Sequence, residues 1–331
     1  MPELRKRFLV DEWVAISPER ASRPRQLHLH SPPDEGSPCP FCPENQEVTP
    51  ASLASYDSPS YPTSSWGVRV VPNKFPALRV EESLGSSPES GLFRALGGVG
   101  AHEVIIESPA HLHSLADLPR EHLPVVLKAW QDRSRDLRCD KRLKQVIIFR
   151  NQGAFAGATL GHVHSQLIAL PIVAPAIRRE LIGARRYYDE YKRCPFCVLV
   201  EEELARDQRI LFQDEKTVVL LPFGSRVPFE TWLFPRSHGA HFVDATDEQL
   251  HSLAGALFDV LQLWKRALGD LSFNLALHSL PFDFEDETYY HWHLEMIPRT
   301  SQIAGFEWGA QMYINPTASE VAARHLKSLL K

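Results

Sequence analysis

The chain of 331 residues contains the same order of sequence features twice, and this repeat constrains the fold more than any other feature of the sequence. Each copy opens on the tetrapeptide CPFC, at residues 39–42 and again at residues 194–197. Each then runs through two apolar strand-like segments, a histidine, an amphipathic stretch, another apolar segment and a final His-x-His. An internal repeat of this kind indicates two copies of one structural unit. We therefore expect two domains, residues 1–175 and 176–331, and the chain length allows both.

The spacing within the two copies supports this alignment. The interval from Glu103 to His111 equals the interval from Glu230 to His238, and both pass through an apolar segment and a proline. Apolar residues recur at helical spacing over 118–137 and 246–268, which predicts one long helix per copy. The strand-like segments are short and bounded by turn residues, which favours antiparallel pairing. The expected fold class is α+β, with a mostly antiparallel sheet and one long helix in each domain.

Composition argues against several kinds of partner. The formal net charge is -5 and the basic residues are scattered, so no basic surface would hold a nucleic-acid backbone. No apolar run reaches the roughly 18 residues that a membrane helix needs. The start "MPELRKRFLVDEW" also lacks the apolar segment of a signal peptide. We expect a cytoplasmic protein with neither nucleic-acid nor membrane partners.

The two CPFC pairs predict metal sites. They hold four of the five cysteines, and in a reducing compartment such pairs favour zinc over disulfides. Each pair supplies two thiolates, and the repeat indicates which distant histidines complete the tetrahedron. The predicted ligands are Cys39, Cys42, His111 and His162 at the first site and Cys194, Cys197, His238 and His291 at the second. Four protein ligands leave no open position, so both zinc ions are expected to be structural.

Alternatives remain for these ligand sets. His113, His241 and His278 lie close enough in sequence to compete as ligands. His293 or Glu180 could replace a thiolate at a differently built second site. The thiols could also be buried without a metal, as free cysteines often are.

The stretch "GHVHSQ" contains the candidate nucleophile. In a strand, His162, His164 and Gln166 would share one face, because side chains two residues apart point the same way. If zinc takes His162, then His164 is free to act as a neutral imidazole nucleophile towards phosphorus. Gln166 could donate an amide N–H to a phosphoryl oxygen as charge builds there. The second copy reads "HWHLE", and its Glu295 would repel a phosphate, so we expect that copy to be catalytically silent.

These segments resemble the galactose-1-phosphate uridylyltransferase family, a branch of the histidine triad superfamily in which two related domains are fused. The similarity covers nearly the whole chain and includes "WVAISPERASRP", "CPFCPEN", "VVPNKFPAL", "HEVIIESPAH", "FRNQGAFAGATLGHVHSQ" and "HWHLEMIPR". It implies that His164 attacks the α-phosphorus of a nucleotide sugar and that sugar 1-phosphate leaves. A second sugar 1-phosphate then takes the nucleotide back, most simply with UDP-glucose and galactose 1-phosphate as the substrates of galactose metabolism.

The resemblance also implies a set of nucleotide-binding residues. They are Arg20, Arg23, Asn73, Lys74, Asn151, Gly157, Ala158, Thr159 and Gln166. Guanidinium groups suit phosphates, and a glycine lets the backbone come close to them. Taken singly, the arginines could instead be solvated surface charges and the asparagines turn residues. The family is typically a homodimer, which would make Arg20 and Arg23 act in the neighbouring subunit.

Two departures from the family pattern bear on the substrate. Where uridylyltransferases place a Tyr-Glu pair that helps hold the hexose, this chain has Ala310 and Gln311. Lys74 stands where these enzymes more often have an acidic residue near the nucleotide. The motifs "HSQ" and "YINP" are also similar to those of ADP-glucose phosphorylase, which passes adenylyl to inorganic phosphate.

Two further hypotheses come from other functional classes. One is a metal-dependent hydrolase in which His162 and His164 both hold a catalytic metal. The other is a non-enzymatic adaptor that uses its CPFC modules to bind partner proteins. The adaptor hypothesis leaves the segment from "FRNQG" to "HVHSQ" unexplained.

Overall fold

The computed structural model describes residues 3–10, 12–16, 38–85, 95–284 and 287–330. Arg20 and Arg23 lie outside the described residues. All other predicted site residues lie within them.

A ten-stranded sheet forms the centre of the molecule, with the strand order β3-β4-β5-β7-β6-β11-β12-β10-β9-β8. All neighbouring strands in it are antiparallel, as the sequence predicts. The first copy of the repeat supplies β3 (Ala54–Tyr56), β4 (Val68–Pro72), β5 (Ala101–Ile106), β6 (Gln145–Gln152) and β7 (His164–Leu170). The second supplies β8 (Ile210–Gln213), β9 (Thr217–Leu220), β10 (Thr231–Pro235), β11 (Phe273–His278) and β12 (His293–Pro298).

The two halves of the sheet join where β6 pairs with β11, from Gln152 opposite Phe273 to Ile148 opposite Leu277. Read outward from this seam, the strands follow in the same succession on both sides: β6-β7-β5-β4-β3 on one and β11-β12-β10-β9-β8 on the other. The internal repeat of the sequence therefore appears as a repeat of the sheet. Pairing at the seam also removes one exposed edge from each half.

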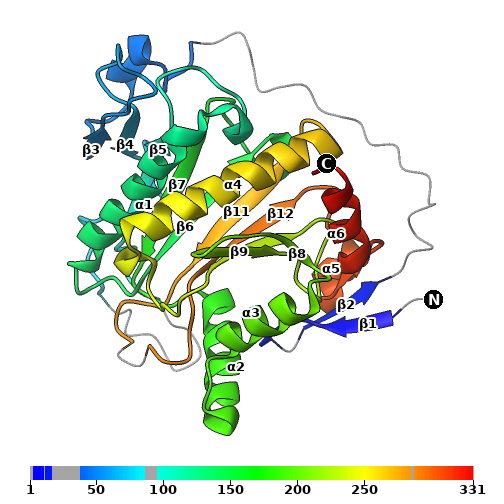
Figure 1. Ribbon diagram of the computed structural model, residues 1–331. Helices are drawn as coiled ribbons and strands as arrows, with labels where there is room; N and C mark the ends of the chain where they lie inside the picture. Colours follow the sequence, from blue (N-terminus) through cyan, green and yellow to red (C-terminus); the bar gives the residue numbers. More distant parts are fainter. Residues whose placement is uncertain (1–2, 11, 17–37, 86–94, 285–286, 331) are drawn as a thin grey trace.

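The two helical stretches of the sequence form α1 (Leu123–Arg138) and α4 (Asp247–Leu268), which lie side by side on one face of the sheet (Figure 1). Thr246 accepts a hydrogen bond from the backbone N–H of Gln249, which completes a capping box and starts α4. Two short 3-10 turns over 115–122 precede α1, so that helix begins later than the apolar periodicity suggests. The side chains of both helices contribute to one core that spans the seam, including Leu127, Trp130, Leu257, Leu261 and Trp264.

Two further helices cover the opposite face of the second half only. They are α2 (Pro175–Tyr191) and α3 (Pro195–Arg206), and the predicted domain boundary falls at the start of α2. Their apolar side chains pack against β9 and β10 in a separate cluster that includes Ile177, Leu181, Phe196, Leu220 and Phe234. The prediction of one long helix per half did not include them, because the buried stripe of α2 is narrow and lies between many charged residues. The corresponding face of the first half carries loops and a small apolar cluster instead.

The two ends of the described chain meet in a small three-stranded sheet. In it, β2 (Trp13–Ile16) pairs with β1 (Glu3–Lys6) and with β13 (Tyr313–Asn315), next to α5 (Gly305–Ala310) and α6 (Ser319–Ser328) (Figure 1). An ion pair of 2.9 Å between Arg5 and Glu320 ties β1 to α6. Among the described residues, no helix is long and apolar enough to cross a membrane.

Candidate active site and metal centres

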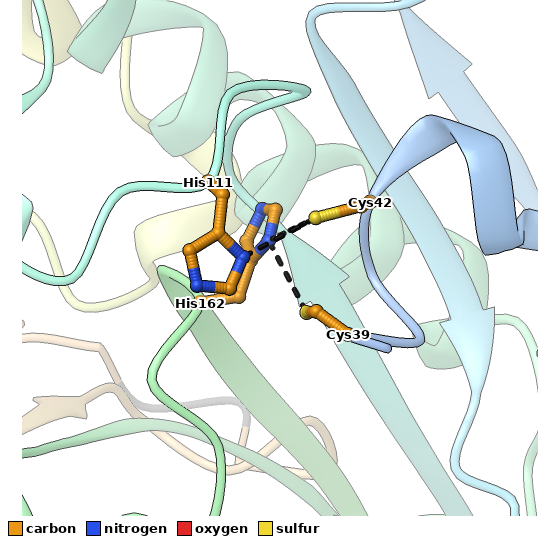
Figure 2. A group of neighbouring side chains, drawn as sticks. All are labelled: Cys39, Cys42, His111 and His162. Carbon is orange, nitrogen blue, oxygen red and sulfur yellow. Dashed lines mark hydrogen bonds between the residues drawn. The ribbon is translucent and has the colours of Figure 1, made fainter. Parts of the chain in front are cut away.

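The four residues predicted for the first metal site converge in space (Figure 2). Cys39 and Cys42 precede a 3-10 helix (Pro43–Val48), His111 follows β5, and His162 precedes β7. Sγ of Cys42 lies 3.2 Å from Nδ1 of His111 and 3.7 Å from Nδ1 of His162. Sγ of Cys39 lies 3.6 Å from the same nitrogen of His162, and all four ligand atoms lie within 4.8 Å of one another.

The surroundings of this cluster suit a metal. Nε2 of His162 donates to the backbone carbonyl of Ser108 at 2.7 Å, which leaves the lone pair of Nδ1 directed at the thiols. Burial and the neighbouring Cys39 raise the pKa of Cys42 to about 12, because two thiolates repel each other without a cation. A divalent cation between them would reverse this effect and favour the thiolates. The donor set and its arrangement therefore fit a metal ion held by four protein ligands.

The second predicted set converges in the same way. Cys194 and Cys197 flank the start of α3, His238 follows β10 and His291 precedes β12. Sγ of Cys197 lies 3.3 Å from Nδ1 of His238 and 3.6 Å from Nδ1 of His291. All four ligand atoms again lie within 4.8 Å of one another.

The competing ligands are placed elsewhere. Nδ1 of His241 donates to the carbonyl of Leu280, and His113 packs edge-on against His111 without joining its cluster. The other three form a separate group with Glu295 that could also hold a metal ion: Glu180, His278 and His293. The structure therefore brings together the two predicted sets and assigns these alternatives to other positions.

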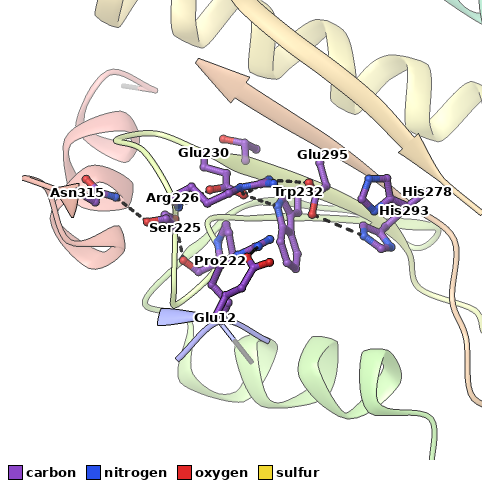
Figure 3. A network of polar contacts seen from close by, with 12 residues as sticks. Glu12, Pro222, Ser225, Arg226, Glu230, Trp232, His278, His293, Glu295 and Asn315 are labelled. Carbon is purple, nitrogen blue, oxygen red and sulfur yellow. Dashed lines mark hydrogen bonds and ion pairs between the residues drawn. The ribbon is translucent and has the colours of Figure 1, made fainter. Parts of the chain in front are cut away.

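The charges of this third group are already compensated by protein side chains. Nδ1 of His278 lies 3.0 Å from a carboxylate oxygen of Glu180, and Tyr290 donates its hydroxyl to Glu180 at 2.8 Å. Burial opposes protonation, but Glu180 and Glu295 raise the pKa of His278 to about 8. Glu295 accepts a hydrogen bond of 2.5 Å from Arg226, which also pairs with Glu230 (Figure 3).

This group occupies the position that corresponds to the nucleophile segment in the first half. His293 and Glu295 stand at the places of His164 and Gln166, and both are 1% exposed. The ring of His293 stacks on Phe234, with 5.0 Å between ring centres. The described residues, with α2 and α3 packed over this face, bury His293, which fits the expectation that the second copy is catalytically silent.

In the first half, His164 begins β7 and faces away from the α1–α4 layer. The intervening Ser165 faces that layer, since its hydroxyl accepts a hydrogen bond of 2.8 Å from the indole of Trp130. Nδ1 of His164 donates to the carbonyl of His162 at 2.8 Å, so the lone pair lies on Nε2. Nε2 has no hydrogen-bond partner among the described residues. Burial, together with the charge of Arg150, lowers the pKa of His164 to about 4, so the ring is neutral near pH 7.

An ion pair that the sequence did not single out holds the backbone of the nucleophile. Arg150 on β6 pairs with Glu107, and both side chains are almost completely buried. The same guanidinium donates to the carbonyl of His164 at 3.0 Å. Removing either partner would leave an uncompensated buried charge beneath the nucleophile.

His102 on β5 fixes the side chain of Gln166. The backbone N–H of Ala77 donates to Nδ1 of His102 at 3.2 Å, so the ring proton is on Nε2. Nε2 then donates to Oε1 of Gln166 at 2.8 Å, and the amide nitrogen of Asn73 lies 3.1 Å from the same ring nitrogen. With its oxygen occupied, Gln166 presents its NH2 group to the site. The alternation of "AHEVII" could have placed His102 on this face, but no pattern linked it to Gln166.

The other predicted nucleotide-binding residues lie around the seam and the following loop. Asn274 of β11 donates to the side-chain oxygen of Asn151 at 2.7 Å and to the carbonyl of Ala156 at 3.0 Å. This leaves the amide nitrogen of Asn151 available to a ligand. Gly157 and Thr159 are exposed on the loop before His162, Ala158 is half-buried, and Lys74 is exposed beyond β4.

Comparison with known proteins gives this site its family context. The family model described as galactose-1-phosphate uridyl transferase, N-terminal domain, matches residues 1–174. A second model, described as a domain of unknown function (DUF4921), matches residues 110–331. The first therefore covers more than half of the chain and includes the first metal cluster and the nucleophile segment.

Individual relatives match over the whole chain. ADP-glucose phosphorylase of Arabidopsis thaliana is 34% identical, over 99% of this chain and 93% of that protein. Galactose-1-phosphate uridylyltransferase of Thermotoga maritima is 28% identical, over 99% of this chain and 98% of that protein. A crystal structure of the Arabidopsis phosphorylase with bound ADP-glucose superposes with a TM-score of 0.84, at 31% identity, covering 99% of this chain and 98% of that one.

The doubled sheet and these matches define a nucleotidyltransferase with an α+β fold of two fused histidine-triad-like halves. The chain belongs to the galactose-1-phosphate uridylyltransferase family. The expected fold class and the resemblance stated from the sequence are both confirmed.

The loop between β6 and β7, residues 153–163, leads to His164 and is called the nucleophile loop. Within it, Gly153 is the position where a side chain is least tolerable. Its φ is +77°, and an added Cβ would lie 2.1 Å from the hydroxyl oxygen of Ser272. We expect Gly153→Ala to lower the free energy of unfolding by about 2–4 kcal/mol, from backbone strain plus overlap. Gly157→Ala is the milder comparison, because Gly157 has φ +84° and ψ 20° in the left-handed helical region, whereas ψ of Gly153 is 160°, and nothing lies within 4 Å of the added atom. It should cost only about 1 kcal/mol in urea denaturation.

The double variant Gly153→Ala/Ser272→Gly separates the two contributions. Removing the serine side chain should restore part of the stability that Gly153→Ala loses, since the overlap with its hydroxyl and Cβ disappears while the 3.1 Å contact with the Cα of residue 272 and the strain remain. Equal stability of Gly153→Ala and Gly157→Ala would contradict this interpretation.

Proposed function

We propose that this protein transfers a nucleoside monophosphate through a covalent intermediate on Nε2 of His164. The observation that carries the proposal is the arrangement around this ring: its Nδ1 proton is held by the carbonyl of His162, and no described residue bonds to its Nε2 lone pair. The amide of Gln166 lies on the same face, and its NH2 group has no hydrogen-bond partner in the described part of the chain. A neutral imidazole with a fixed tautomer is a suitable nucleophile towards phosphorus.

The proposed reaction has two half-reactions. In the first, Nε2 of His164 attacks the α-phosphorus of a nucleotide sugar, and sugar 1-phosphate leaves. In the second, a phosphate-bearing acceptor attacks the same phosphorus and restores the free histidine. Gln166 and Asn151 would donate amide N–H groups to phosphoryl oxygens as negative charge builds there. Asn73, Lys74, Gly157, Ala158 and Thr159 are proposed to bind the nucleotide, as the family resemblance implies.

We propose ADP-glucose as the nucleotide sugar and inorganic phosphate as the acceptor. The Arabidopsis phosphorylase is more similar to this chain than the Thermotoga uridylyltransferase is, at 34% against 28% identity. Ala310, at the end of α5, and Gln311 also lack the carboxylate that would fix sugar hydroxyls in a uridylyltransferase. UDP-glucose with galactose 1-phosphate is the second candidate, which the matching N-terminal family model favours.

We propose zinc as the metal of both Cys2His2 clusters, in a structural role. Two thiolates and two imidazoles form a donor set typical of zinc, and four protein ligands close the coordination shell. The hydrolase hypothesis finds no support, because His164 lies outside both clusters. The adaptor hypothesis leaves the arrangement around His164 without a purpose. The homodimer, the contribution of Arg20 and Arg23 to a neighbouring site, and the cytoplasmic location stay predictions.

The covalent intermediate can be tested by mass spectrometry. After mixing with ADP-glucose, the intact protein should gain the mass of one adenylyl group, measured without acid. His164→Ala should form no adduct, whereas His325→Ala in α6 should form it like the parent chain. UDP-glucose in a parallel sample shows which base is accepted. Absence of an adduct with either nucleotide sugar would sink the proposed function.

The metal sites predict a selective loss of zinc. We expect two zinc ions per purified chain, and one in Cys42→Ser. The free energy of unfolding should fall by about 2 kcal/mol or more, because metal binding contributes directly to folding. Cys139 is exposed and belongs to neither cluster, so Cys139→Ser should keep both ions. Equal zinc content in the two variants, measured by atomic emission, would contradict the assignment.

His102 should act through Gln166. His102→Phe removes the hydrogen bond that orients the amide, and we expect kcat to fall by about 10-fold while KM for the nucleotide sugar changes little. In His102→Gln, the new amide nitrogen can donate from nearly the same place, so part of kcat should return. Steady-state kinetics of both variants, beside their melting temperatures, test this role. An equal loss in both would show that His102 supports the fold alone.

A further inference from the structure

A cavity of about 570 Å³ lies beside the nucleophile loop. One wall is the loop itself and the other is the chain that follows β12: Ala154, Phe155, Ala156, Gly157, Arg299, Ser301, Gln302 and Ile303. Gly157 leaves open space where a side chain would begin, so the loop does not fill the cavity. The lining therefore combines a guanidinium, a hydroxyl and an amide within reach of one ligand.

The guanidinium of Arg299 has no carboxylate partner among the described residues. It is half-buried, and the charged group that acts on it most strongly is another cation, Arg226. Burial and this repulsion lower the pKa of Arg299. With one exception, the other described arginines of low exposure pair with an acid, as Arg5, Arg133, Arg150, Arg209 and Arg226 do. The exception is Arg69, which is satisfied by Gln46, Thr49 and the ring of Trp66.

Hydrogen bonds hold Arg299 in a fixed direction. Its Nε donates to the side-chain oxygen of Asn274, and its backbone N–H donates to the carbonyl of Ser272 at 2.8 Å. Asn274 in turn contacts Asn151 and the carbonyl of Ala156. No bond from the two terminal nitrogens of Arg299 is found within the described part of the chain. They are thus free to bind a ligand in the cavity, in the fork geometry that suits phosphate.

The cavity lies on the same face of the sheet as the nucleophile. Glu295 and Ile297 follow His293 on β12 by two and four positions and share its face. Asn274, which accepts a hydrogen bond from Arg299, pairs with Ile297 and, across the seam, with Asn151. Asn151 in turn is two residues from Phe149, which stands opposite Gln166. Arg299, Asn274 and Asn151 therefore form a row of polar side chains that leads from the cavity to the part of the sheet next to Gln166.

We propose that Arg299 forms an anion subsite for the phosphate group of the acceptor, whether inorganic phosphate or a sugar 1-phosphate. This proposal rests on the proposed function and adds a residue to it. An oxygen of the bound phosphate forms the new P–O bond as the bond between phosphorus and Nε2 of His164 breaks, and the electron pair returns to the ring. In the first half-reaction, the oxygen of the leaving sugar 1-phosphate stands where the attacking oxygen of the acceptor stands in the second. The phosphate of the leaving group therefore occupies the same subsite.

The binding of the acceptor can be measured separately in the second half-reaction. The nucleotidyl-enzyme is formed with ADP-glucose, freed of small molecules and mixed with increasing inorganic phosphate or glucose 1-phosphate, and the loss of adduct is followed by mass. In Arg299→Gln, the concentration that gives half the maximal rate should rise by about 10- to 100-fold. Arg299→Lys keeps the charge and should stay within about 5-fold of the parent chain. An unchanged concentration in Arg299→Gln overturns the subsite.

The variant Asn274→Ala distinguishes phosphate binding by the guanidinium of Arg299 from a merely structural role of Arg299 in holding Asn274. This variant removes the hydrogen bond to Nε but keeps the guanidinium, so it should raise the half-maximal concentration much less than Arg299→Gln does. An equal rise in both variants would show that Arg299 acts only by holding Asn274, which overturns the proposal.

A binding measurement keeps the subsite testable even if the proposed function fails. Inorganic phosphate is titrated calorimetrically into His164→Ala and into His164→Ala/Arg299→Gln. Binding to the first that is at least about 10-fold weaker in the second supports the subsite without any catalysis. Equal binding to both chains, or none to either, counts against it. A parent chain that forms no adduct would sink the proposed function alone.

Discussion

The pairing of β6 with β11 is the interaction on which the rest of the structure depends. Each half supplies five strands and one long helix, and the seam joins the halves so that α1 and α4 cover one face of the sheet together. The same seam brings Asn274 of the second copy against Asn151 of the first. The candidate site is therefore built from both copies, although its nucleophile comes from one.

The two copies differ in how their polar residues are compensated. Gln166 is a neutral amide, and one neutral donor, His102, is enough to fix its direction while it stays accessible. Glu295 carries a charge into a fully buried place and needs Arg226 beside it. Burial of a charge is tolerated only with such a partner, so the second copy became a closed polar network. The change from the amide of Gln166 to the carboxylate of Glu295 thus accompanies an accessible sheet face in the first half and a buried one in the second.

The sequence predicted the parts of the molecule that its repeat duplicates. The long helix, the antiparallel strands and the Cys2His2 set each appear once per copy, so each copy served as a check on the other. The contacts of His102, Arg150 and Asn274 were not predictable, because they depend on which residues of neighbouring strands face one another. The helix α2 was missed because only a narrow stripe of it is apolar. The small sheet was missed because β1 and β2 are short and β13 joins β2 across nearly the whole chain length.

The helix α2 belongs to neither copy of the repeat, yet its Glu180 holds His278 and Tyr290 in the network around His293. The segment that connects the two copies thus provides the carboxylate that completes the buried polar network of the second copy. The inequality of the two halves is a property of the linker as much as of the duplicated sequence. In a duplicated fold of this kind, the segment inserted between two equal units can decide which of them keeps an accessible surface for chemistry and which serves as its scaffold.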